Sequence, residues 1–76
     1  MSRYLTENQI DILAEEAVTN YEVSGSWSAA YRAVAEYAAD DFGWQQFQRN
    51  TPLLLAVKRA KLIWQAETIR VKAAIA

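Results

Sequence analysis

Three observations indicate an all-α fold, a small bundle of three main helices that forms a single domain over residues 1–76. Apolar residues recur at intervals of three and four along three segments of the chain, which is the spacing of one face of a helix. The few helix-breaking residues, two Gly and one Pro, lie between these segments or at their ends. The hydrophobic fraction of 53% favours a folded chain over a disordered one.

The first helix is expected over about residues 6–22. Thr6 and Gln9 have the spacing of a capping box, in which each side chain accepts a hydrogen bond from the other residue's backbone N–H. Leu5 and Ile10 flank this box at the positions of a hydrophobic staple. We expect a loop over residues 22–26, where Gly25 breaks the helix. The apolar stripe of this helix consists of Ile10, Leu13, Ala14, Ala17, Val18 and Tyr21.

The second helix is expected over about residues 26–42, with Ser24 or Ser26 as its cap and Gly43 as its end. Trp44 and Phe47 lie three residues apart, which predicts a short helical turn near residues 44–49 that packs on the core. The apolar stripe of the second helix consists of Trp27, Ala30, Tyr31, Val34, Tyr37, Ala38 and Phe42.

The third helix is expected over residues 51–75, a stretch that contains no Gly and whose only Pro suits a first helical position. Thr51 is the expected cap and Pro52 the expected first helical residue. On a helical wheel this segment has two opposed apolar stripes, where a surface helix needs only one. The broader stripe, which we assign to the core, includes Leu53, Val57, Trp64 and Val71. The opposite stripe consists of Leu55, Leu62, Ala66, Ile69 and Ala73.

The opposite stripe of the third helix has two interpretations. It is buried within the chain, if this helix is central, or it contacts a second molecule. We favour the second molecule, because so short a chain cannot easily cover a helix on two sides. Leu55, Leu62 and Ile69 recur every seven residues, the rhythm of a seam between two helices.

The composition argues against an enzyme. The chain has no Cys and no His, so the commonest zinc ligands and the commonest general base are missing. Carboxylates lie one helical turn apart at Asp11 and Glu15, and no further ligands follow at metal-binding spacing. Ser24 and Ser26 flank a single Gly without a following Lys, which is not a phosphate-binding pattern. We therefore expect no catalytic residues, no cofactor and no bound metal.

Charge is divided along the chain. Residues 1–51 contain three Lys or Arg against eight Asp or Glu, whereas residues 52–76 contain five against one. Basic residues on a helix can contact phosphates, so a nucleic-acid interface is the alternative function. The candidate anion or nucleic-acid contacts are Lys58, Arg59, Lys61, Arg70 and Lys72.

The aromatic residues supply further interface candidates. Three Trp, four Tyr and two Phe exceed what so small a core readily covers. Trp and Tyr dominate the hot spots of protein interfaces, so Tyr31 and Trp44 are candidate anchors beside Leu55, Leu62 and Ile69.

These observations predict a non-enzymatic helical module that binds another protein, acting as a small regulator or inhibitor. Compact chains without catalytic residues are frequent among the accessory proteins of phages and plasmids, and we expect such an origin. The predicted protein partner includes a second copy of the chain, as a homodimer, because small chains gain stability from oligomerisation. We expect no membrane segment, because the longest apolar run is short, and therefore a cytoplasmic location.

Overall fold

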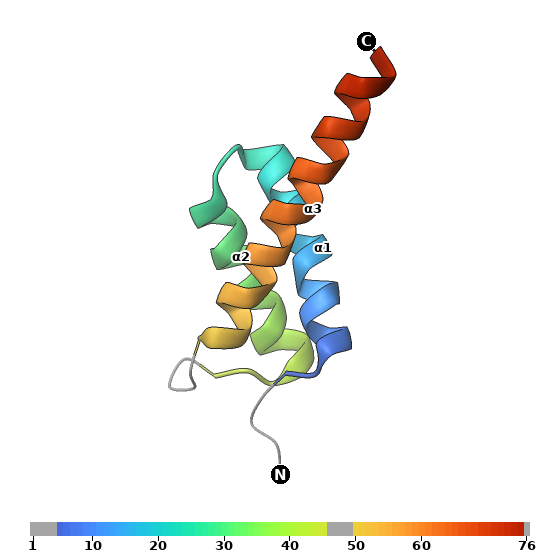
Figure 1. The fold of residues 1–76 in the computed structure, drawn as a ribbon. Coiled ribbons are helices and arrows are strands. Elements are labelled where there is room, and N and C mark those ends of the chain that lie inside the picture. Colours follow the sequence, from blue (N-terminus) through green and yellow to red (C-terminus); the bar gives the residue numbers. More distant parts are fainter. Residues whose placement is uncertain (1–4, 46–49, 76) are drawn as a thin grey trace.

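The computed structural model describes residues 5–45 and 50–75, and the side chains as far as residue 72. It contains the helices α1 (Glu7–Ser24), α2 (Trp27–Phe42) and α3 (Thr51–Ile75), with no strand among the described residues. The all-α prediction is confirmed. In Figure 1, α1 and α3 run in the same direction and α2 runs against both, with α3 lying across the other two.

The start of α1 is the predicted capping box. The backbone N–H of Thr6 donates to Gln9 Oε1 at 2.9 Å, and the backbone N–H of Gln9 donates to Thr6 Oγ1 at 3.1 Å. The end of α1 differs from the prediction, because residues 22–24, expected in a loop, are helical. Gly25 is the residue that takes the left-handed conformation, with φ of 71°, and its N–H donates to the carbonyl of Tyr21. The helix therefore continues up to this glycine.

The two ends of α2 lie where the sequence predicts them. Ser26, rather than Ser24, is the cap, and its hydroxyl accepts a hydrogen bond from the N–H of Ala29 at 3.3 Å. Gly43 ends the helix with φ of 71°. The expected helical turn near residues 44–49 is wrong for Trp44 and Gln45, which are not helical, and its residues 46–49 lie outside the described residues. The left-handed glycine redirects the chain, and the N–H of Trp44 instead donates to the carbonyl of Ala38 at 3.0 Å.

Helix α3 spans the predicted residues 51–75, but Thr51 is not the residue before the helix, as expected of a cap. Thr51 is its first residue, and the N–H of Leu54 donates to the carbonyl of Asn50 at 3.0 Å. Pro52 therefore occupies the second helical position rather than the first. Proline is tolerated at either position, because the first N–H groups of a helix have no partner within it.

The core contains side chains from all three helices. Leu13, Val34 and Leu53 are its largest fully buried side chains, one from each helix. Many of the other members are alanines, which allow helices to approach closely. The complete buried cluster is Ile10, Leu13, Ala14, Ala17, Val18, Ala30, Val34, Ala38, Leu53, Ala56, Val57 and Ala60.

Helix α3 is longer than its neighbours, with 25 residues against 18 in α1 and 16 in α2. At a rise of about 1.5 Å per residue, α3 is about 10 Å longer than α1. Its C-terminal part extends beyond the ends of the other helices (Figure 1). The core assignment of Val71 is therefore wrong: it lies on the same side of the helical wheel as Leu53, but it is 56% exposed and lines an open groove beside the end of α1.

Candidate protein-binding surface on helix α3

Helix α3 carries an exposed apolar strip on the side opposite its buried face. Leu55 is 41% exposed, Leu62 58% and Ile69 68%, while Leu53 and Ala60 on the other side are fully buried. The structure thus brings together three of the five predicted interface residues outside the core. We call this surface the outward strip, and its members are Leu55, Leu62, Ala66 and Ile69.

The geometry of the outward strip follows from the seven-residue spacing. Seven residues make almost two full turns, so Leu55, Leu62 and Ile69 are each rotated by only about 20° from the previous one. The three large side chains therefore lie almost in line over about 21 Å of helix. The small Ala66 lies between Leu62 and Ile69 and leaves space for the backbone of a neighbouring helix. The result is a straight apolar surface on a helix without internal Gly.

The two aromatic candidates lie elsewhere. Tyr31 belongs to α2, Trp44 follows the end of α2, and both are partly buried against the core cluster. The outward strip lies on α3 and does not include them. Their burial gives each ring a role in packing the fold.

Arg59 is one of the predicted anion contacts, and it is engaged within the chain. Its guanidinium donates hydrogen bonds to Glu7 Oε2 and, at 2.9 Å, to Asp11 Oδ1, which ties α3 to the first two turns of α1. The hydrogen bond with Glu7 is the largest cause that raises the pKa of Arg59. Because its pKa is raised in the folded chain, the charged guanidinium stabilises the fold. This stabilisation is fully present below the ordinary pKa of arginine and is lost as the pH rises through the raised value, far from neutral pH.

Lys61 is also engaged within the chain. Its ammonium lies 5.8 Å from the ring centroid of Trp27, a cation–π contact. Trp27 stacks on Tyr21 with centroids 3.9 Å apart, and Tyr21 meets the edge of Trp64 at 5.3 Å. These three rings join the end of α1, the start of α2 and the middle of α3, and Lys61 lies over the ring of Trp27.

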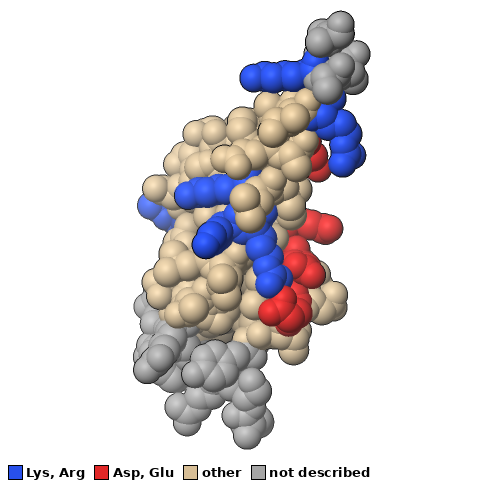
Figure 2. All heavy atoms as spheres, in the orientation of Figure 1, with Lys and Arg blue, Asp and Glu red and all other residues tan. Residues whose placement is uncertain are grey.

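The other predicted cations are exposed. Lys58, Arg70 and Lys72 form no ion pair with any residue in the described part of the chain. Figure 2 shows lysine and arginine side chains along the face where α3 lies, with the carboxylates gathered on the side of α1. Cations of α3 therefore flank the outward strip, and the carboxylates of α1 lie beyond them on one side.

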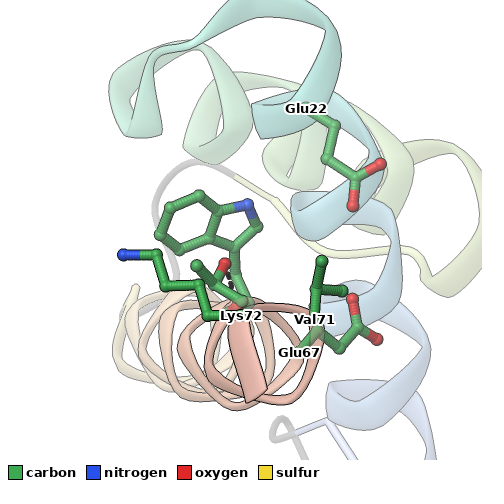
Figure 3. A pocket seen from close by; sticks show the side chains of 6 residues that line it. Glu22, Glu67, Val71 and Lys72 are labelled. Atoms are coloured by element: carbon green, nitrogen blue, oxygen red, sulfur yellow. Dashed lines mark hydrogen bonds between the residues drawn. The ribbon is translucent and has the colours of Figure 1, made fainter. Parts of the chain in front are cut away.

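A groove that the sequence analysis did not predict lies between α3 and the C-terminal end of α1 (Figure 3). Its space is about 370 Å³, and its lining residues are Glu22, Trp64, Glu67, Thr68, Val71 and Lys72. The hydroxyl of Thr68 donates to the carbonyl of Trp64 at 2.9 Å and therefore does not point freely into the groove. The only sequence signal for this groove was the length of α3 relative to its neighbours.

The described residues contain no cluster of side chains typical of metal binding. Within residues 5–45 and 50–75, no group of three or more His, Cys, Asp or Glu side chains could hold a metal ion. Within the same residues, every helix is too short or too polar to cross a membrane.

Three comparisons with known proteins add no assignment. No protein-family model, no curated protein and no solved structure matches this chain.

Proposed function

We propose that this protein is a non-enzymatic helical module that binds another protein through the outward strip of α3. The observation that supports the proposal is the exposure of Leu55, Leu62 and Ile69 in one line outside the core. Monomeric proteins seldom leave continuous apolar surface in water unless it has a function. A rigid helix that presents such a line is suited to receive a second helix.

The energetics of the strip indicate what the partner must contact. Complete burial of a leucine or isoleucine side chain contributes about 1.5–3 kcal/mol. Covering the exposed fractions of Leu55, Leu62 and Ile69 would therefore contribute about 2.5–5 kcal/mol. Association itself costs about 4–15 kcal/mol in lost freedom of motion. The strip alone gives weak binding, so a stable complex also uses the residues that flank it.

The module would act as a small regulator or inhibitor, by occupying a surface of its target. The lack of His and Cys is consistent with this role. An origin on a phage or plasmid and a cytoplasmic location both stay predictions.

Nucleic-acid binding is the alternative function, and the exposed cations Lys58, Arg70 and Lys72 favour it. Two observations favour protein binding instead. Arg59 and Lys61 are engaged within the chain, and an apolar strip occupies the centre of the basic face. A salt titration of binding to random duplex DNA separates the two functions, because contacts to phosphates weaken steeply as salt increases.

The proposal is tested by photo-crosslinking in cells that produce the protein. A photoreactive amino acid replaces Leu62 in one variant and Val23, which is 87% exposed on α1, in the control variant. We expect a discrete crosslinked protein from position 62 and none from position 23. Equal patterns from both positions, or no adduct from position 62, would show that the strip does not contact a protein.

A further inference from the structure

We infer that the partner presents an acidic amphipathic helix to the outward strip, an inference that rests on the proposed function. This inference specifies the chemistry of the partner. It also predicts that the partner is a different protein and not a second copy of this chain. The charges around the strip, its width and its spacing support this partner.

The flanks of the strip are cationic on both sides. On the helical wheel of α3, Lys58 and Lys72 lie along one side of the strip and Arg70 lies along the other. The single carboxylate of α3, Glu67, lines the groove that faces α1. A partner whose apolar seam has Asp or Glu on both sides would place carboxylates opposite these cations.

The shape of the strip fits a helix. Residues on one face of an α-helix recur over the same seven-residue distance as Leu55, Leu62 and Ile69, so two seams can interlock along their length. Ala66, exposed between Leu62 and Ile69, allows the partner backbone to approach there. The binding mode is one apolar helix face against another, flanked by charge.

A second copy of this chain fits the strip poorly. Residues 52–76 contain five Lys or Arg and one Glu. When two α3 helices pair through their outward strips, parallel or antiparallel, the flanking charges that α3 itself contributes on both sides are cations. Like charges across an interface disfavour that partner, so the charge pattern selects against self-association here.

A lipid surface also fits poorly. Helices that lie in a membrane interface bury a broad apolar face, which often contains Trp or Phe. The outward strip has one large side chain for every two turns and contains no aromatic residue. Such a narrow strip matches the seam of a helix pair.

The test is a selection from displayed amphipathic helices against the full chain. The library fixes leucine at the seam positions and randomises the flanking positions between Glu and Lys, so the selected charge identifies the preferred partner chemistry. We expect helices with Glu on both flanks to be enriched. Their affinity should decrease by about tenfold or more in Leu62→Glu, since a charge then replaces a central apolar contact. Val23→Glu, the same chemical change off the strip, should bind like the wild type.

A charge reversal makes the test specific. The double variant Lys58→Glu with Lys72→Glu should reject helices with Glu on both flanks. It should instead select helices with Lys on the flank that meets positions 58 and 72 and Glu on the flank that meets Arg70, because only one side of the strip is then negative. Arg32→Glu changes an exposed cation on α2 and serves as the charge-matched control, with unchanged selection.

Each other outcome overturns a defined part of the account. Enrichment of neutral or basic helices that depends on Leu62 would leave the proposed function in place and overturn the acidic partner. Sedimentation of the wild-type chain as a dimer that Leu62→Glu dissociates would assign the strip to a second copy. Leu62-dependent binding to vesicles of anionic phospholipid, with no helix selected, would assign it to a membrane. Recovery of no Leu62-dependent ligand of any kind would overturn the proposed function as well.

Discussion

Two leucines lie on opposite sides of α3, so the same Leu→Ala change at both positions tests the division between core and surface. Leu53 is fully buried, and Leu62 is 58% exposed. Both lie inside the same helix, where Leu and Ala have similar propensities, so Leu→Ala changes the packing and little else. We expect Leu53→Ala to destabilise the protein much more than Leu62→Ala does.

The magnitudes follow from burial. Truncation of a fully buried leucine costs about 2–5 kcal/mol, because a cavity is left behind. For a chain of 76 residues the total free energy of unfolding is about 4–11 kcal/mol, so Leu53→Ala removes a large part of it. Leu62 has less than half of its surface covered, and each buried methylene contributes about 0.8 kcal/mol. Leu62→Ala should therefore cost about 1 kcal/mol or less.

The assay is urea denaturation followed by circular dichroism, which gives the free energy of unfolding of each variant beside the wild type. The two variants should differ by more than 1 kcal/mol, with unchanged denaturant slopes. Equal losses from Leu53→Ala and Leu62→Ala would mean that the outward strip is part of the packed core. The division on which the proposed function depends would then be incorrect.

Three further predictions concern individual elements. Thr6→Ala removes the cap of α1 and should lower the free energy of unfolding by about 0.5–2 kcal/mol, and an unchanged denaturation midpoint would show that the capping box contributes nothing. Val34→Asp places an unpaired carboxylate at a fully buried position and should abolish the helical circular dichroism; a variant that still melts like the wild type would contradict the burial of Val34. Val71→Gln, on the exposed C-terminal part of α3, should change the free energy of unfolding by about 0.5 kcal/mol or less, whereas a loss typical of a core residue would restore the original assignment of Val71.

Features that depend on neighbouring residues could be predicted from the sequence. The pairing of Thr6 with Gln9 and the helix ends at Gly25 and Gly43 depend on residues close in the chain, and the structure confirms them. Helix periodicity also separated the buried side of α3, with Leu53, from the exposed side, with Leu62. Such information is local, because one turn of helix fixes which side chains share a face.

Features that depend on how helices lie against each other could not be predicted. A helical wheel gives the direction of Val71 but not the length of the neighbouring helix, so it could not show that Val71 is more than half exposed beside the end of α1. Arg59 pairs with Glu7 and Asp11, which precede it by 52 and 48 residues, and no local pattern indicates such partners. The groove beside Trp64 also depends on how the helices lie against each other, because the different lengths of α1 and α3 leave it open.

The central claim is that the outward strip of α3 binds another protein and is not required for the fold. The variant Leu62→Glu tests it most directly, because one sample gives both the melting temperature and the affinity for a partner identified by crosslinking or selection. The account predicts a melting temperature close to that of Val23→Glu and a loss of affinity of about tenfold or more. A chain that unfolds, or one that keeps full affinity for its partner, would contradict the claim.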